Sequence, residues 1–390
     1  MLHIRTYNKI SSKGLSLFPS DFYQVSEQEE TPTAVLLRSQ KLHDIELPES
    51  VLAIARAGAG TNNIPVERYT EKGVVVFNTP GANANAVKEL VLTGMLLGSR
   101  GILQGRDFVG SLSDMKDSDE MAKLLEAEKK RFAGSELKGK TLGIVGLGAI
   151  GSLVADVALS MGMKVMGYDP ALSIDAAWRL SSRVKRMETM EQLLGKVDYL
   201  SLHVPAIAAT KHLINADNLT NMKPSAVILN FARAAIVDSE AVVVALNANA
   251  LRMYICDFPE PWLIGHEKVV AMPHIGASTA EAEENCASMA VNQLREFMEH
   301  GNIINSVNFP ATDLPRGQAP CRLTFSNENK PGVLGEVLSV FADNNINIFD
   351  MVNKSRESIA YNILDISEEP NQSIVDTLKA MPSVLNVRLL

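Results

Sequence analysis

The chain has 390 residues, enough for about two or three domains with sizeable hydrophobic cores. Hydrophobic residues make up 46% and charged residues 21% of it, as in ordinary globular proteins. The formal net charge of −8 gives no support to nucleic-acid binding, which usually needs a basic surface. The three cysteines form no metal-binding spacing and no disulfide framework, and no signal peptide or membrane-spanning stretch is evident. We therefore expect a cytoplasmic protein with no bound metal and no membrane partner.

Residues 1–100 read as alternating strands and helices. Short apolar runs predict strands over residues 34–38, 52–56 and 74–78. Strands that alternate with helices indicate a parallel sheet, with ligand-binding loops at the carboxyl ends of the strands. The segment 85–100 is apolar around most of a helix, so we expect it to be buried.

A second α/β unit is predicted over residues 101–286, after a polar connecting helix and loop at 101–139 whose charges most simply form a solvated face. The predicted strands each end in a polar or loop-forming residue and lie at 141–145, 164–168, 197–203, 226–230, 253–257 and 269–272. This pattern is typical of a sheet that gathers chemistry at its carboxyl edge.

The next segment, a long helix at 279–300, is expected to lead the chain back to the first domain. The substrate-binding domain is then discontinuous, with residues 1–100 and 287–312. Residues 318–390 follow a Pro- and Gly-containing linker and read as βαββαβ, a ferredoxin-like order. The predicted fold is thus α/β: two Rossmann-like, doubly wound parallel-sheet domains with a cleft between them, and a small C-terminal domain.

A glycine motif in the second unit predicts dinucleotide binding. Gly146, Gly148 and Gly151 form a G-x-G-x-x-G turn between an apolar strand and a helix. The first glycine permits the turn, the second admits a pyrophosphate, and the third lets the helix pack on the strand. Asp169 ends the next strand, where a carboxylate binds ribose hydroxyls and repels a 2′-phosphate. We expect NAD rather than NADP.

Hydride transfer to NAD from an alcohol needs a base, a cation and an acidic group that tunes the base. Arg233, Glu260 and His274 supply these three groups, and each follows a predicted strand of the same sheet. Any one of them alone is more often structural. Their shared position favours a catalytic set.

The sequence resembles the D-2-hydroxyacid dehydrogenases over nearly its whole length. The matching motifs are Arg56–Ile64, Phe77–Asn83, Gly146–Gly151 with Tyr168–Pro170, Leu202–Pro205, Asn230–Arg233 and Pro273–Thr279. The resemblance implies that Arg233 binds the substrate carboxylate and polarises the carbonyl. It also implies that His274 is the acid/base and that Glu260 pairs with it and favours the imidazolium.

The same resemblance implies a set of cofactor-binding residues at the strand ends and the glycine turn. These are Gly146, Gly148, Ala149, Ile150, Gly151, Asp169, His203, Val204, Pro205, Phe231, Ala232, Arg233, Asp257, His274, Gly276 and Ala277. The chain departs from the family twice: Ala234-Ala235 follows the catalytic arginine where glycine is usual, and the segment from Asp257 to Glu260 is short.

Two arginines in the first domain bear on the substrate. Arg38 and Arg56 both follow predicted strands, and a pair of guanidinium groups suits a dianionic phosphate. Either arginine could instead pair with a carboxylate. By resemblance the substrate-binding residues are Arg38, Arg56, Gly58, Ala59, Asn83 and Arg233, and the implied reaction oxidises 3-phospho-D-glycerate to 3-phosphohydroxypyruvate.

The C-terminal segment resembles the ACT regulatory domain, through Asn327–Leu334 and Asn345–Ile348. The resemblance implies an L-serine effector at Asn327, Asn329 and Asn347, and a homodimer or homotetramer; alternatively the domain serves assembly alone. Two other functions stay open. One is reduction of another 2-keto acid, such as hydroxypyruvate or glyoxylate. The other is a non-enzymatic binding protein that senses NAD, against which the complete Arg233, Glu260 and His274 set argues.

Overall fold

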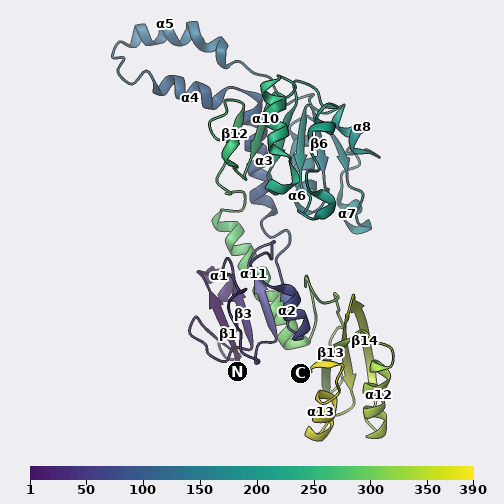
Figure 1. The fold of residues 1–390 in the computed structure, drawn as a ribbon. Helices are drawn as coiled ribbons and strands as arrows, with labels where there is room; N and C mark the ends of the chain where they lie inside the picture. The colour runs from purple at the N-terminus through teal and green to yellow at the C-terminus, as the bar shows by residue number, and fades with distance from the viewer. The chain divides into compact units, whose positions relative to one another are not determined.

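The computed structural model describes residues 1–390, apart from the side chain of Asp175. The chain forms two compact units, drawn in Figure 1. The first unit comprises Met1–Asn83 and Ala280–Leu390, and the second comprises Ala84–Thr279. The C-terminal domain therefore belongs to the same compact unit as the first sheet.

Both unit boundaries lie earlier in the chain than the predicted domain boundaries, at residues 83/84 in place of 100/101 and at 279/280 in place of 286/287. Helix α3 (Ala84–Ser99) belongs to the second unit, although we expected it in the first. Two of its glycines allow close packing on the second sheet: a Cβ at Gly94 would lie 3.0 Å from Cζ of Phe231, and one at Gly98 would lie 3.1 Å from Val227. One face of the helix is thus buried, and it packs against the second sheet.

The first unit contains a parallel sheet in the order β2-β1-β3-β4-β5. Its strands are β1 (Leu2–Tyr7), β2 (Tyr23–Ser26), β3 (Ala34–Leu37), β4 (Ala53–Arg56) and β5 (Val75–Phe77). The accompanying helices are α1 (Ser12–Leu15), α2 (Val66–Glu71), α11 (Ala280–Arg295) and a final π-helical turn, η5 (Glu296–His300). Helix α11 packs against α1, β3 and β4, which explains why the chain after the second unit returns to the first sheet.

The C-terminal domain has the predicted βαββαβ order. It consists of β13 (Cys321–Glu328), α12 (Val333–Asp343), β14 (Ile348–Arg356), β15 (Ile359–Ile366), α13 (Gln372–Lys379) and β16 (Val384–Leu389). The strands form an antiparallel sheet in the order β14-β15-β13-β16. Leu323 and Phe325 of β13 join the core that includes α12 and α13 side chains, so Thr324, which lies between them, faces the opposite side.

That opposite face of the C-terminal sheet packs against the rest of the first unit. Tyr361 shares a hydrophobic core with Phe77, Phe297 and Phe309, and its hydroxyl donates to the Gly301 carbonyl at 2.8 Å. Gly301 ends η5 with φ 73°, and a Cβ there would lie 2.5 Å from Cγ2 of Thr324. Glycine is therefore required both by the left-handed backbone and by the close approach of β13.

The second unit is built on a parallel sheet in the order β12-β11-β10-β9-β6-β7-β8. Its strands are β6 (Thr141–Val145), β7 (Lys164–Tyr168), β8 (Lys185–Arg186), β9 (Tyr199–Leu202), β10 (Val227–Asn230), β11 (Met253–Cys256) and β12 (Val269–Ala271). The helices are α3, α6 (Ala149–Ser160), α7 (Ile174–Arg179), α8 (Met190–Leu194), α9 (Ala216–Leu219) and α10 (Ser239–Asn247). The strand order reverses between β6 and β9, and nucleotides bind at such a reversal in doubly wound folds.

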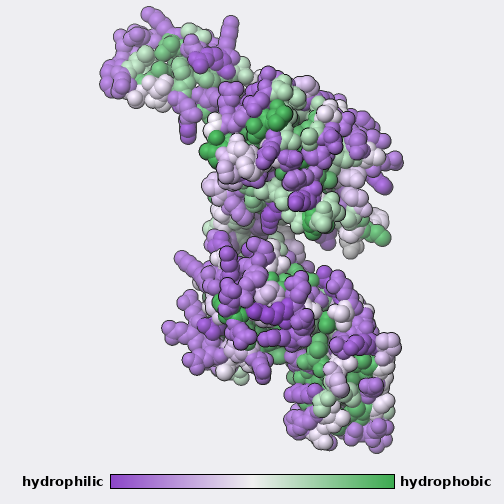
Figure 2. Space-filling model, in the orientation of Figure 1, coloured by the Kyte–Doolittle hydropathy of each residue, from purple (hydrophilic) through white to green (hydrophobic). Residues whose placement is uncertain are grey.

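An arm extends from the second unit between α3 and β6. Figure 1 shows its two helices, α4 (Ile102–Gly110) and α5 (Ser118–Glu128), as a pair that stands away from the sheet. Neither helix contains a buried residue, and Ile102 and Val109 are 48% and 54% exposed. The space-filling view in Figure 2 shows apolar side chains among the hydrophilic ones on this arm. Among the described residues, no helix has the length and apolar character needed to cross a membrane.

Candidate active site

The glycine turn has the geometry that nucleotide binding requires. Gly146 follows β6 with φ 88°, and a Cβ there would lie 2.5 Å from the His203 carbonyl oxygen. A Cβ at Gly151 would lie 2.0 Å from the Gly146 carbonyl oxygen, so the start of α6 packs tightly on the turn. At Gly148, by contrast, a Cβ would meet nothing within 4 Å. The backbone at Gly148 is thus open to a pyrophosphate at the amino end of α6.

The Asp169 carboxylate, beside the glycine turn, is fixed by two backbone amides. Its Oδ2 accepts a hydrogen bond from the Leu147 amide at 2.8 Å, and its Oδ1 accepts one from the Ala171 amide at 2.9 Å. Each oxygen keeps a further lone pair for a ribose hydroxyl. The negative charge beside the glycine turn disfavours a 2′-phosphate, so the described residues fit NAD.

His203 lines the glycine turn with its backbone, and its side chain is half-buried. It follows β9, and its Nε2 lies 2.8 Å from Oγ of the buried Ser201. Burial lowers the pKa of His203 to about 4, because the charged imidazolium would lose its hydration. The His203 ring is therefore neutral at pH 7. The next residue, Val204, also packs on the glycine turn, because its Cγ1 would lie 2.9 Å from a Cβ at Gly146.

The lowered pKa of His203 predicts an acid-dependent loss of stability. The unfolded chain binds a proton at His203 near pH 6.5, whereas the folded chain does so only near pH 4. Between those values the unfolded state holds the extra proton, so this contribution to stability falls as the pH falls. We expect a loss of about 2 kcal/mol between pH 7.5 and pH 5. Urea unfolding of the wild type and of His203→Gln measures it, and an equal pH dependence in both proteins would contradict the assignment.

Arg233 is presented by a loop whose backbone is fixed by a buried asparagine. Asn230, the fully buried last residue of β10, accepts from the Ala232 amide at 3.2 Å and donates to the Arg233 carbonyl at 2.9 Å. The Arg233 side chain is exposed, donates to the Ala232 carbonyl at 2.6 Å, and lies 5.7 Å from the Phe258 ring centroid. Most of its N–H donors remain available to a carboxylate.

The alanines after Arg233 are compatible with this loop. Ala234 and Ala235 begin a short 3₁₀ helix, Ala234–Ile236, and neither has a positive φ. Glycine at these positions is therefore not required by the backbone, and the departure from the family motif leaves the arginine at the same strand end.

His274 lies in a strained loop that a buried aspartate holds in place. Its φ is 56°, in the left-handed region, and its exposed ring lies 4.7 Å from the Phe258 ring centroid. Asp257, 1% exposed, accepts from the amides of Ile275 at 2.8 Å and Gly276 at 2.7 Å. Strained backbone of this kind is concentrated at functional sites. Asp257 therefore positions the loop of His274, which the sequence did not reveal.

The expected pair between Glu260 and His274 is not formed among the described residues. Glu260 instead accepts a short hydrogen bond from the hydroxyl of Ser239, which also accepts from the Trp262 indole at 2.9 Å. The His274 ring lies against Phe258, which precedes Glu260 by two residues. The short segment after Asp257 thus places an aromatic ring, and not a carboxylate, beside the imidazole.

The other predicted cofactor residues lie around the same strand ends. Phe231 is 5% exposed, and its ring packs against Gly94 of α3. Val204, Ala232 and Ala277 are half-buried, and Pro205 is exposed. Ala149 and Ile150 form the first turn of α6.

In the first unit, Arg38 and Arg56 lie at the ends of adjacent strands, with Leu37 paired to Arg56 across the sheet. Nη1 of Arg38 lies 2.8 Å from Oε1 of Glu283 on α11. Arg56 uses its guanidinium to hold backbone: Nε donates to the Arg38 carbonyl at 3.0 Å and Nη1 donates to the Gly60 carbonyl. One arginine therefore pairs with a carboxylate and the other builds the loop of Gly58 and Ala59.

The predicted effector asparagines do not come together within one copy of the C-terminal domain. Asn327 is buried, and its Oδ1 accepts from the Asn362 amide at 2.8 Å. Asn329 is exposed beside the turn that joins β14 and β15 and donates to the Glu357 carbonyl at 3.0 Å. Asn347 lies at the other end of β15, where its backbone amide donates to the Ser367 hydroxyl oxygen at 3.1 Å. The strand between them is about 24 Å long, because its paired residues run from Ile359 to Ile366.

The remaining predicted substrate residue, Asn83, is half-buried in the turn before α3. Asn230, Ser239 and Glu283 had no predicted role. Asn230 had a usable signal, since it is a polar residue at the end of an otherwise apolar strand. Ser239 and Glu283 had none, because each contacts a residue far away in the chain.

Comparison with known proteins now bears on the chemistry. Residues 107–276 match the NAD-binding domain of D-isomer specific 2-hydroxyacid dehydrogenases, and residues 322–383 match the ACT domain. The D-3-phosphoglycerate dehydrogenase of Haemophilus influenzae is 32% identical over 89% of this chain and 83% of its own length. The chain belongs to the D-2-hydroxyacid dehydrogenase family. It is an NAD-dependent dehydrogenase, as its glycine turn and Asp169 indicated.

Other proteins are similar to this dehydrogenase in sequence or in structure. The D-3-phosphoglycerate dehydrogenase of Escherichia coli K12 is 32% identical, with coverage of 89% of this chain and 83% of that one. NAD⁺-bound 3-phosphoglycerate dehydrogenase from Entamoeba histolytica superposes with a TM-score of 0.62 at 26% identity, covering 79% of this chain and 98% of that one. The TT0316 protein of Thermus thermophilus superposes with a TM-score of 0.65 at 27% identity, covering 78% and 100%.

Proposed function

We propose that this dehydrogenase oxidises C2 of 3-phospho-D-glycerate to give 3-phosphohydroxypyruvate, the entry step of L-serine biosynthesis. The observation that carries the proposal is the likeness over most of the chain to relatives named D-3-phosphoglycerate dehydrogenase, with an ACT domain attached. Arg233 and His274 supply the catalytic groups, and Arg38 supplies a cation for the phosphate.

The chemistry follows from the side chains of the second unit. The glycine turn and Asp169 would hold NAD, which would supply the acceptor for the C2 hydride. Arg233 binds the carboxylate through the N–H donors that it presents to solvent and polarises the C2 oxygen as the carbonyl forms. His274 takes the hydroxyl proton on its imidazole and acts as the general base. Asn230 and Asp257 act as positioning residues, because they fix the backbone of the Arg233 and His274 loops.

Glu260 has a supporting role in this proposal. Its negative charge favours the imidazolium that forms when His274 takes the proton, even without a direct hydrogen bond. Because Glu260 accepts a bond from Ser239, a direct pair with His274 requires Glu260 to leave Ser239. We infer that Glu260 contributes mainly through its charge.

Arg38 distinguishes a phosphorylated substrate from an unphosphorylated one. Its partner Glu283 is easily displaced, because the two side chains are 41% and 44% exposed and such ion pairs contribute only about 0–1 kcal/mol. We expect Arg38→Ala to lower kcat/KM for phosphohydroxypyruvate by about 10- to 100-fold, as the loss of a charged hydrogen bond does. The value for hydroxypyruvate should change little. Glu283→Gln is the matched control and should keep the wild-type kcat/KM for phosphohydroxypyruvate. If Arg38→Ala lowered kcat/KM equally for both substrates, Arg38 would have no role in binding the phosphate.

The substrate is tested by steady-state NADH oxidation with phosphohydroxypyruvate, hydroxypyruvate and glyoxylate. We expect the phosphorylated keto acid to have the highest kcat/KM. A preference for hydroxypyruvate or glyoxylate would replace the proposal by a reductase of unphosphorylated keto acids. The absence of turnover with all three, together with tight NADH binding, would favour the NAD-sensing protein.

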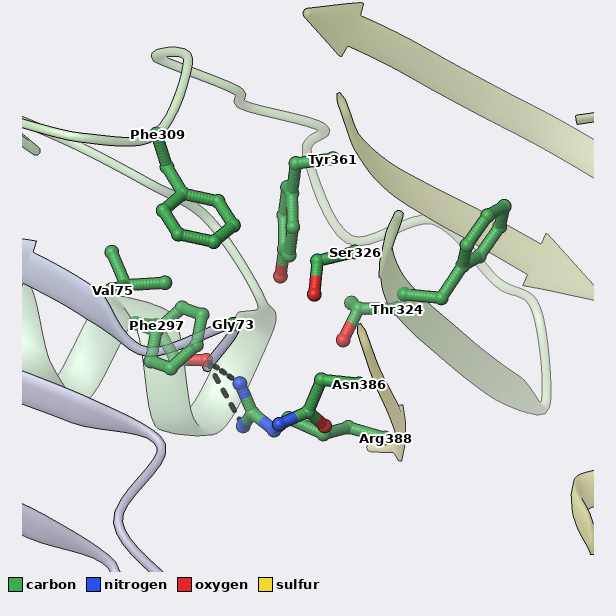
Figure 3. A pocket seen from close by; sticks show the side chains of 10 residues that line it. Gly73, Val75, Phe297, Phe309, Thr324, Ser326, Tyr361, Asn386 and Arg388 are labelled. Carbon is green, nitrogen blue, oxygen red and sulfur yellow. Dashed lines mark hydrogen bonds between the residues drawn. The ribbon is translucent and has the colours of Figure 1, made fainter. Parts of the chain in front are cut away.

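We also propose that L-serine inhibits the enzyme through the C-terminal domain. Asn329 is exposed and Asn327 lies near it, whereas Asn347 is at the far end of the sheet, so one serine contacts both ends only where two copies of the domain meet. Asn329→Ala should abolish inhibition without changing the uninhibited rate. This variant is a better test than deletion of the domain, because Tyr361 and Arg388 dock the domain on the rest of the first unit (Figure 3).

A homodimer is the proposed assembly, with a homotetramer if the ACT domains also pair. The arm of α4 and α5 suits an interface, since its apolar side chains have no buried position within the chain. Light scattering of the wild type and of an Ile102→Glu, Val109→Glu variant tests this assignment. An unchanged mass in the variant would remove the arm from the interface. The three cysteines are buried and free, in keeping with a reducing compartment such as the cytoplasm.

A further inference from the structure

A serine at the start of α10 forms the contact that keeps Glu260 in place. Ser239 is 4% exposed, and its hydroxyl donates to the Glu260 carboxylate and accepts from the Trp262 indole at 2.9 Å. An indole N–H can only donate, so the single proton of the Ser239 hydroxyl is directed to Glu260. The three side chains therefore form one chain of hydrogen bonds that ends on the carboxylate.

Helix α10 does not need the Ser239 hydroxyl for its own stability. Its amino end is capped by Asp238, whose side chain accepts from the Ala241 amide at 3.0 Å. Ser239 follows the cap as the first helical residue, and serine is a weaker helix former than alanine. The effect of this hydroxyl is therefore to be found in its bonds to Glu260 and Trp262.

The position of Glu260 matters because Phe258, two residues earlier, contacts the proposed acid/base. The centroid of the Phe258 ring lies 4.7 Å from that of His274 and 5.7 Å from the guanidinium carbon of Arg233. A carboxylate in direct contact with the imidazole would stabilise its protonated form. Oxidation needs a neutral imidazole that can accept the hydroxyl proton, so a direct ion pair would move this reaction to higher pH.

Other ionisable groups surround this carboxylate and the imidazole. Tyr254 and Cys256 of β11 lie near the carboxylate, and burial raises the pKa of Cys256 to about 11 and that of Tyr254 above its usual range. Both are therefore neutral near pH 7. Arg233 keeps its positive charge throughout the working pH range. Asp257 accepts from two amides of the imidazole's loop, and these bonds are the same in every variant described below.

We propose that Ser239 is a positioning residue that holds the Glu260 carboxylate away from His274. The carboxylate then acts on the imidazole through its charge and not through a direct ion pair, and the imidazole stays available as a base. The inference rests on the proposed acid/base role of His274, but it does not depend on which keto acid is the substrate. The residues that carry it all belong to the second unit.

The pH dependence of kcat/KM for oxidation tests the proposal, with the hydroxy acid whose keto form is the best substrate. In Ser239→Ala we expect the acidic limb of the profile to move to higher pH by about 1 unit, because the freed carboxylate pairs with the imidazolium. Ser239→Thr keeps a hydroxyl and should keep the wild-type limb. Ser118→Ala is the matched control and should also keep it, since Ser118 is exposed and follows a capping aspartate as the first residue of α5.

A double variant shows whether Ser239 acts through Glu260. Glu260→Gln removes the charge but keeps an oxygen that can accept from the Ser239 hydroxyl. In this background, Ser239→Ala should no longer move the acidic limb. A shift that persists without the Glu260 charge would overturn the proposal, and so would equal profiles for the wild type and Ser239→Ala.

NMR titration of the histidine rings gives a readout that needs no turnover. The His274 signal is the one missing from His274→Asn, and it should titrate about 1 pH unit higher in Ser239→Ala than in the wild type. If Ser239→Ala folds poorly, Ser239→Cys fills the same space with a weak donor, and the same upward shift is expected. An unchanged titration in the folded variant would overturn the proposal. Turnover retained by His274→Asn would instead refute the proposed acid/base, while the titration would still report where Glu260 lies.

Discussion

Replacing His274 with asparagine is expected to lower kcat by about 10²- to 10⁴-fold, the usual contribution of a general acid/base. Asparagine is the informative replacement because His274 has φ 56°, and asparagine tolerates the left-handed region better than alanine does. The bonds from Ile275 and Gly276 to Asp257 involve only backbone amides, so they should survive the change. Steady-state kinetics measures kcat, and NADH fluorescence titration should give an unchanged Kd.

The second unit contains a matched control for His274. His212 is also exposed and also has a left-handed backbone, with φ 47°, but it follows no strand of the sheet. His212→Asn should therefore keep kcat and the Kd for NADH. If His274→Asn retained wild-type turnover, another group would have to be the base. If both variants lost activity together with NADH binding, the loss would reflect the backbone and not proton transfer.

Local patterns were enough to predict the elements that carry the cofactor. The strand, turn and helix at β6 and α6 follow from an apolar run and three glycines, and Asp169 follows from its position at the end of the next strand. The βαββαβ order of the C-terminal domain was also evident, because its strands and helices are short and sharply bounded. Which of the two sheets a helix packs against was not evident from the sequence. Helix α3 is apolar on most of its surface, so its sequence does not distinguish between the two sheets.

Contacts between distant residues account for what the sequence could not predict in the site. Arg38 pairs with Glu283, 245 positions later, and no pattern in either segment indicates that partner. Arg56 has the positive charge expected of a phosphate-binding residue, but its guanidinium donates hydrogen bonds to backbone carbonyls. The predicted effector asparagines come from two neighbouring segments of the sequence. The antiparallel sheet nevertheless places Asn329 and Asn347 at opposite ends of β15. Residue type was predictable in each case, whereas the partner was not.

Replacing Arg322 with methionine is expected to destabilise the first unit by about 3–5 kcal/mol, the usual cost of breaking a buried ion pair. Arg322 is fully buried, and its Nε and Nη2 bind Asp365 at 2.7 and 2.9 Å. Its other N–H groups donate to the carbonyls of His300, Leu314 and Pro315. The variant leaves Asp365, 2% exposed, as an uncompensated charge. Both tryptophans lie in the second unit, so tryptophan fluorescence would not report on the first unit. The measurement is hydrogen exchange of peptides from β13 and β15. We expect this exchange to be about 10²- to 10⁴-fold faster in the variant.

Two further variants separate the charge of Arg322 from its role as a hydrogen-bond donor. Arg356→Met removes an exposed arginine from β14 of the same sheet and should leave exchange unchanged. Arg322→Met combined with Asp365→Leu removes both charges, and replacement of a buried pair by apolar residues is often neutral. Recovery in the double variant would show that the uncompensated carboxylate causes the loss. If the double variant exchanges as fast as Arg322→Met, the three carbonyls that lose their donor are responsible, and Arg322 holds the end of η5 and the linker by hydrogen bonding. Wild-type exchange in Arg322→Met would mean that the aromatic core around Tyr361 alone keeps the C-terminal domain in place.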